Sequence, residues 1–109
     1  MGGMGIAAQN AGENFQYILI NNGAHESVGG QPTIGLDIDV EQILRACGFR
    51  QVYRAETAEE VREGMAHLAE EALSCMVVYV DQGSREDLGR PTVAPRDNKE
   101  AMMKLFLAR

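Results

Sequence analysis

The sequence lacks any apolar run that approaches the ~20 residues of a membrane-spanning helix. Its N-terminus also lacks the basic start and the apolar block that mark a secretion signal. We therefore expect a cytoplasmic protein that has no membrane partner.

Basic residues are few in this chain. It has 10 Lys and Arg residues against 16 Asp and Glu residues, which gives a formal net charge of -6. No basic cluster gathers on a predicted face to offset this charge, which would repel a phosphate backbone. Nucleic acid is therefore not expected as a partner.

Cysteine is scarce as well. The two cysteines, Cys47 and Cys75, lack C-x-x-C spacing, and each lies inside an apolar run. This placement is typical of buried free thiols, and a disulfide between them is the alternative. No zinc motif is visible in the sequence.

What the chain does contain is an alternation of two apolar patterns. Its 109 residues, of which 45% are hydrophobic, allow one globular domain with a modest core. Continuous apolar runs typical of buried strands alternate with period-3.6 runs typical of helices. This order predicts an α/β fold with a three-layer (αβα) Rossmann-like parallel sheet. The predicted strands are 16–21, 51–55 and 75–80, and the predicted helices are 40–47, 57–73 and 96–107.

Capping residues mark the predicted helices. Asp39 is expected to cap the first helix and Gly48 to end it, while Thr57 and Glu60 have the spacing of a capping box. Pro95 suits the first turn of the last helix, after an irregular stretch at 81–95.

Each predicted helix also has an apolar face, and we expect that of the last helix to be buried. The three faces consist of Val40, Ile43, Leu44 and Cys47, then Val61, Met65, Leu68, Ala69 and Ala72, and finally Ala101, Met102, Leu105 and Phe106.

Residues 1–12 form a separate question. Their Gly3 to Ala8 segment matches the G-x-G-x-x-A dinucleotide fingerprint, but no strand precedes it to deliver the glycines to a helix. We interpret 1–12 as the remnant of a helix whose beginning is not in this chain, followed by β-α-β-α-β-α over 13–109. The whole of 1–109 is then one unit.

The first predicted strand runs directly into "NNGAHESVGGQPT" at 21–33. Ligands of open parallel sheets bind beyond the carboxyl ends of the strands, which is where Asn21 and Asn22 would lie. Amide and backbone carbonyl oxygens suit Mg²⁺, and glycines allow close approach of a diphosphate. An ordinary Asn-Gly turn with a mobile loop is the alternative interpretation.

The segment "ILINNGAHESVGGQPT" resembles the second half of the thiamine-diphosphate motif, which opens with Gly-Asp-Gly and closes with Asn-Asn. Its continuation is most similar to the phosphonopyruvate decarboxylase family, with the sulfopyruvate decarboxylase β subunit as a close relative. A second segment, "DLGRPTVAPRDNKEAMMKLF" at 87–106, resembles the C-terminal end of the same family.

The resemblance implies a 2-oxo acid decarboxylase that uses thiamine diphosphate and Mg²⁺ and converts phosphonopyruvate to phosphonoacetaldehyde and carbon dioxide. It implies that Asn22 binds Mg²⁺ through its side chain and Ala24 through its carbonyl. By the same resemblance, Asn21 and Gly23 form the turn that holds the cofactor. The loop after them would line the substrate end, with the polar groups His25, Glu26, Ser27 and Gln31.

The roles of the loop residues stay open at this point. His25 is a candidate proton donor or phosphonate contact, and a structural role is the alternative. Glu26 is a second catalytic candidate, and the alternative is a solvent-facing acid. Arg85 and Arg90 are candidate phosphonate contacts, although pairing of these arginines with Glu86 or Asp87 is favoured. His67, within the second helix, is expected to be a surface residue without chemistry.

Two parts of the family pattern have no counterpart here. The chain contains no Gly-Asp-Gly, and its first aspartate, Asp37, follows the loop. The pyrimidine-binding domain that the family requires is also absent. We therefore expect the C-terminal part of a diphosphate-binding domain that is inactive alone, needs the missing portion or a partner subunit, and forms a homo-oligomer. A non-catalytic α/β interaction module and a Rossmann-like binder of another phosphate ligand are the alternatives.

Overall fold

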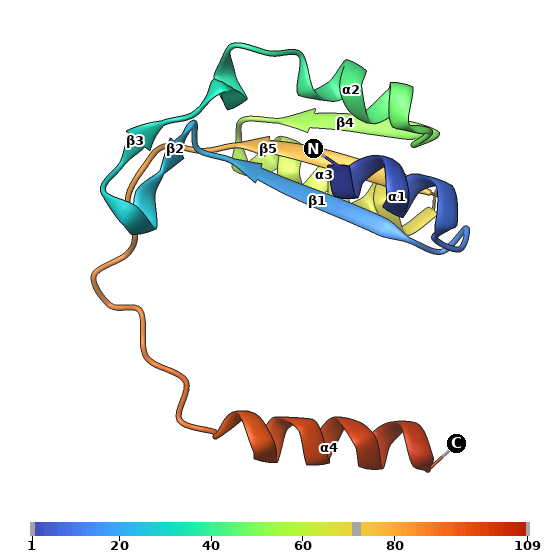
Figure 1. Ribbon diagram of the computed structural model, residues 1–109, viewed down its shortest axis with the longest axis vertical. Helices are drawn as coiled ribbons and strands as arrows, with labels where there is room; N and C mark the ends of the chain where they lie inside the picture. The colour runs from blue at the N-terminus through green and yellow to red at the C-terminus, as the bar shows by residue number, and fades with distance from the viewer. Residues whose placement is uncertain (1, 71–72, 109) are drawn as a thin grey trace.

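The computed structural model describes residues 2–70 and 73–108 and shows a small sheet between helices (Figure 1). Its order of elements agrees with the predicted one, with the addition of a small hairpin and two 3-10 turns. The elements are α1 (Gly2–Asn10), β1 (Gln16–Asn21), β2 (Ala24–His25), η1 (Glu26–Val28), β3 (Gln31–Pro32), η2 (Ile34–Leu36), α2 (Val40–Cys47), β4 (Gln51–Ala55), α3 (Ala58–Glu70), β5 (Ser74–Tyr79) and α4 (Pro95–Leu107).

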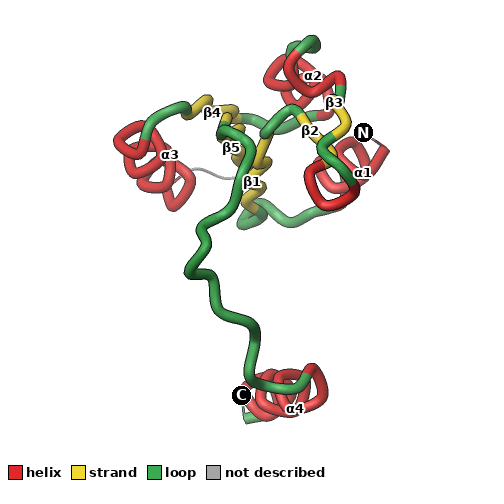
Figure 2. Tube along the Cα trace, turned by 90° about the vertical axis from the view of Figure 1, so that its left-hand side faces the viewer, coloured by secondary structure: helices red, strands yellow, loops and turns green. Residues whose placement is uncertain are grey.

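The main sheet has three strands in the order β1-β5-β4, and both pairings are parallel. The central strand β5 pairs Val77 with Leu19 on one side and with Arg54 on the other. The two helices α1 and α2 lie on one side of this sheet and α3 lies on the opposite side (Figure 2). The prediction of a three-layer α/β fold with a parallel sheet is confirmed.

The predicted caps account for the helix boundaries. The Asp39 carboxylate accepts a hydrogen bond from the Gln42 backbone N–H at 2.8 Å, and Gly48 ends α2 with a φ of 114°. At the start of α3, Thr57 Oγ1 accepts from Glu60 N, and the Glu60 carboxylate accepts from Thr57 N. This is the reciprocal capping box that the sequence predicts.

One half of the core lies between the sheet and the α1–α2 layer. Leu44 of α2, Cys75 and Val77 of β5 have no exposed surface, and Val52 of β4 is also buried. The side chains of β5 alternate between the two faces of the sheet. Met76 and Val78, which alternate with Cys75 and Val77, therefore point into the second half of the core.

The second half of the core lies under α3 and contains Leu68 and Met76, each 1% exposed. Gly64 makes this close contact possible, because a Cβ at that position would lie 2.5 Å from Met76 Sδ. The predicted α3 stripe is therefore partly wrong, since Met65 and Ala69 are exposed while Gly64 faces the sheet. The predicted positions at 71 and 72, Ala72 included, lie outside the described residues.

The last helix differs most from its prediction. Pro95 occupies its first turn as expected, after an irregular linker at 81–94, but none of the residues of α4 is buried. The expected burial of Ala101, Met102, Leu105 and Phe106 is wrong, because α4 stands apart from the sheet (Figure 1). None of the helices in the described ranges is long and apolar enough to cross a membrane.

Both cysteines are free thiols, as predicted, and they differ in accessibility. Cys75 is fully buried in β5, whereas Cys47 is half-buried at the end of α2. Burial raises the pKa of the Cys75 thiol to about 12. Since the thiolate is the reactive form, iodoacetamide at pH 8 is expected to modify Cys47 and leave Cys75 intact until urea unfolds the chain. Peptide mass spectrometry measures this, and equal labelling of both thiols in the folded protein would contradict the described core.

Candidate functional site

The candidate site lies where β1 ends, at the carboxyl edge of the parallel sheet. Two consecutive asparagine side chains fold back onto the backbone there. Asn21 Oδ1 accepts a hydrogen bond from Gly23 N at 3.1 Å, and Asn22 Oδ1 accepts from Ala24 N at 3.1 Å. These paired Asx turns reverse the chain immediately after the strand.

Asn21 is the buried member of the pair, at 7% exposed. Its Nδ2 donates to the Gly35 carbonyl oxygen at 2.7 Å, so that one amide joins the end of β1 to η2. Gly35 is needed for this contact, because a Cβ there would lie 2.8 Å from Asn21 Oδ1. Asn21 thus positions the loop at 21–33, which the sequence predicts to bind a ligand.

Gly23 is required by the turn itself. Its φ of +67° lies in the left-handed region, and a Cβ would lie 2.5 Å from Leu36 Cδ1. The Gly23 carbonyl oxygen accepts from Thr33 N at 2.8 Å, which closes the hairpin formed by β2 and β3.

Asn22 is more open than Asn21, and Glu26 orients it. Asn22 Nδ2 donates to Glu26 Oε2 at 2.8 Å, and the other Glu26 oxygen accepts from the backbone N–H of Gly83. The side-chain oxygen of Asn22 is therefore held against the Ala24 backbone. Because a carbonyl oxygen has two lone pairs, Asn22 Oδ1 retains one for a cation.

The backbone carbonyl of Ala24, two residues further along the chain, is a second candidate oxygen ligand. In the antiparallel hairpin Ala24 is opposite Pro32, and the bond from Thr33 N to the Gly23 carbonyl makes this a non-hydrogen-bonded pair, so the Ala24 carbonyl is not used across the hairpin. An amide oxygen and a backbone carbonyl two residues apart form a donor set of the kind that Mg²⁺ takes. In the ranges that the structure describes, no group of three or more His, Cys, Asp and Glu side chains could hold a metal.

The other predicted loop residues lie around this turn. His25, Glu26, Ser27 and Gln31 are all exposed on the hairpin and on η1 between its strands. Arg85 is paired with Asp87 at 2.7 Å, as favoured from the sequence, whereas within the described ranges Arg90 forms no ion pair with Glu86 or Asp87, so that part of the prediction is wrong. His67 is exposed on α3 and stacks on the Tyr53 ring.

An apolar cavity of about 210 Å³ lies directly behind the turn, between α1 and the loop that leads to α2. It is bounded by the buried amide residue of the turn and by side chains of α1, β1, η2 and α2. The lining residues are Met4, Leu19, Asn21, Thr33, Ile34, Gly35, Ile38, Val40 and Ile43.

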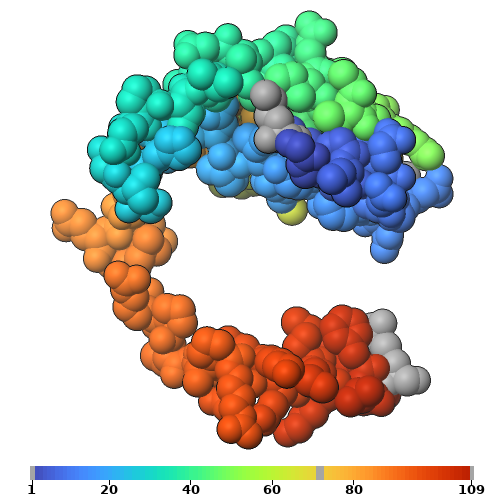
Figure 3. Space-filling model, in the orientation of Figure 1, coloured from blue at the N-terminus to red at the C-terminus, as the bar shows by residue number. Residues whose placement is uncertain are grey.

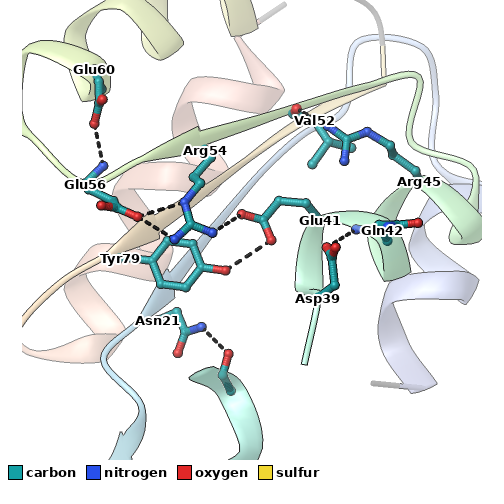
Figure 4. A network of polar contacts seen from close by, with 11 residues as sticks. Asn21, Asp39, Glu41, Gln42, Arg45, Val52, Arg54, Glu56, Glu60 and Tyr79 are labelled. Carbon is teal, nitrogen blue, oxygen red and sulfur yellow. Dashed lines mark hydrogen bonds and ion pairs between the residues drawn. The ribbon is translucent and has the colours of Figure 1, made fainter. Parts of the chain in front are cut away.

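The structure also shows a polar cluster that sequence reasoning missed (Figure 4). The Arg54 guanidinium lies 4.1 Å from the centre of the Tyr79 ring and 3.1 Å from the Glu41 carboxylate. Tyr79 donates its hydroxyl to Glu41 at 3.1 Å. Burial, followed by this hydrogen bond, raises the pKa of Tyr79.

This cluster borders a wider groove of about 630 Å³ at the same edge of the sheet. Part of this cluster could have been predicted, because Arg54 and Tyr79 lie near the carboxyl ends of two predicted strands. The pairing with Glu41 was not visible, since Glu41 lies 13 and 38 residues away along the chain.

Comparison with known proteins supports the sequence resemblance. No family model matches the chain. Two curated proteins named phosphonopyruvate decarboxylase do match over 98 residues, with 29% identity for that of Streptomyces viridochromogenes and 30% for that of Streptomyces hygroscopicus. Both matches cover 89% of this chain but only 25% and 24% of the relatives, so the chain spans about a quarter of their length. The predicted similarity to these decarboxylases is confirmed.

Proposed function

We propose that this chain supplies part of the thiamine-diphosphate and Mg²⁺ site of a decarboxylase that converts phosphonopyruvate to phosphonoacetaldehyde and carbon dioxide. The observation that carries the proposal is the turn after β1, where Asn22 Oδ1 accepts from Ala24 N and the Ala24 carbonyl belongs to a non-hydrogen-bonded pair of the hairpin. The names of the two matching decarboxylases support phosphonopyruvate over sulfopyruvate as the substrate.

The residues present fit two ligands of a magnesium ion. Mg²⁺ requires near-octahedral coordination by six oxygens, so a carboxylate, the cofactor diphosphate and water must complete the shell. In this proposal the carboxylate belongs to a Gly-Asp-Gly segment, which this chain does not contain. The chain is then the C-terminal portion of a diphosphate-binding domain, and it is inactive without the remaining portion or a partner subunit.

Each residue of the turn has a distinct part in this proposal. Asn21 fixes the loop, and Glu26 orients Asn22 toward the metal while it ties the start of the linker to the hairpin. When bound, thiamine diphosphate supplies the electron sink for the loss of carbon dioxide.

The exposed hairpin faces the substrate end in this proposal. His25 can act there as a proton donor or phosphonate contact, with Glu26 as the second catalytic candidate and with Ser27 and Gln31 as polar contacts. Two free cysteines agree with the reducing cytoplasm as the location.

Substitution of Asn22 by alanine is expected to abolish the weak response of the chain to Mg²⁺ and thiamine diphosphate. Proton–nitrogen NMR spectra at millimolar ligand measure it, because the amide signals of Gly23, Ala24 and His25 report directly on the turn. We expect these signals to shift when both ligands are present and to shift little with thiamine diphosphate alone, since the metal links the diphosphate to the protein.

Asn98→Ala is the matched control, because Asn98 is an exposed asparagine on α4, far from the turn along the chain. Its spectrum is expected to respond as the unmodified chain does. Equal shifts in Asn22→Ala and Asn98→Ala would overturn the role of Asn22. Micromolar affinity for thiamine diphosphate with Mg²⁺, or phosphonoacetaldehyde released by the chain alone, would contradict the proposal that the chain holds only part of the site.

A further inference from the structure

The sheet has an uncovered apolar strip on the side of α3. Gln16 of β1 donates its side-chain amide to the Leu68 carbonyl of α3, so the even-numbered residues of β1 face that side. Ile18 and Ile20 follow on the same face and are 43% and 61% exposed, and Val80 after β5 is 43% exposed. We name Ile18, Ile20 and Val80 the β1 strip.

The helix α4 also has an exposed apolar face. Its residues Met102, Leu105 and Phe106 have the spacing that places them on one face, yet they are 55%, 63% and 66% exposed. A helix of 13 residues is marginal in water without a partner to bury its apolar face. The β1 strip and the apolar face of α4 are both exposed to solvent, and each could bury the other.

The α4 helix does not contact the β1 strip of its own chain. Figure 3 shows the body and α4 as two arms with open space between them. The radius of gyration is 16.6 Å, whereas a compact chain of this length has about 13 Å. Two hydrogen bonds hold the start of the linker at the site: Val80 N donates to the Asn21 carbonyl, and Gly83 N donates to Glu26.

We propose that α4 of one copy docks on the β1 strip of a second copy, and the reverse, to form an exchanged dimer. Such reciprocal contact is the usual symmetry of homodimers. The open space in Figure 3 is where the second copy would lie. Charge favours it too, because α4 carries three cations and two carboxylates while α3, beside the strip, carries four carboxylates and one cation.

Cross-linking between two different chains tests the exchange. In a background with Cys47→Ala and Cys75→Ala, one chain carries Ile20→Cys and the other, labelled with nitrogen-15, carries Phe106→Cys. Mild oxidation of the mixture is expected to give a disulfide-linked heterodimer that mass spectrometry identifies. The control pairs Phe106→Cys with Ile6→Cys, an exposed position on α1 on the other side of the sheet. It is expected to give about tenfold less disulfide-linked heterodimer.

A single chain that carries both Ile20→Cys and Phe106→Cys separates exchange from closure within one copy. A disulfide-closed monomer as its main product would overturn the proposal, and so would equal cross-linking in the Ile6→Cys control.

Light scattering of the unmodified chain gives a second measurement that needs no cysteine variant. We expect twice the 11.9 kDa chain mass at tens of micromolar, and Phe106→Asp is expected to raise the dissociation constant at least about tenfold. A monomer at that concentration, or an unchanged dimer in Phe106→Asp, would overturn the exchange.

Discussion

Substitution of Leu44 by alanine is expected to lower the free energy of unfolding by about 2 to 5 kcal/mol, because it removes a fully buried side chain and leaves a cavity. Leu44 has no exposed surface and joins α2 to the β4–β5 half of the sheet. Domains of this size have a total stability of only about 5 to 15 kcal/mol. The variant is therefore expected to be partly unfolded at 37 °C.

Urea unfolding followed by circular dichroism measures this loss. The matched control is Leu88→Ala, the same change at a linker position that is 60% exposed, and it is expected to stay within about 0.5 kcal/mol of the unmodified chain. Similar midpoints for the two variants would show that the face of α2 is not packed as described.

The regular elements of the body could be predicted because their signals are local. A continuous apolar run such as that of β5 and a capping pair such as Thr57 and Glu60 each lie within a few residues. The partner of a helix face is not a local property. The spacing of Met102, Leu105 and Phe106 indicates which face of α4 is apolar, but it does not indicate what covers that face, so the predicted burial was wrong.

The same distinction applies to the candidate site. The sequence indicated Asn21 and Asn22 because they follow a predicted strand, and the structure places both in the turn. The sequence could not indicate that the Asn21 amide is buried and donates to Gly35, which lies 14 residues further along the chain. Nor could it pair Ala24 with Pro32, because two-residue strands have no periodicity to detect.

Substitution of Asn21 by alanine is expected to remove stability and ligand response together. The change leaves the buried Gly23 N–H and the Gly35 carbonyl without their side-chain partner. An unsatisfied buried polar group costs about 1 to 3 kcal/mol, so we expect a loss of about 2 to 4 kcal/mol in the free energy of unfolding. Since η2 and the turn are then no longer joined, the NMR response to Mg²⁺ and thiamine diphosphate is expected to vanish as well.

The adjacent residue supplies the control, because Asn22→Ala makes the same chemical change at a more exposed position. Its partners are Glu26, which is exposed, and the Ala24 N–H, so its free energy of unfolding is expected to fall by about 1 kcal/mol or less. Asn22→Ala should thus lose the ligand response and keep the fold, whereas Asn21→Ala should lose both. Urea midpoints and NMR spectra of the two variants separate these roles. If Asn21→Ala were as stable as Asn22→Ala, the buried amide would not be what holds the loop in place.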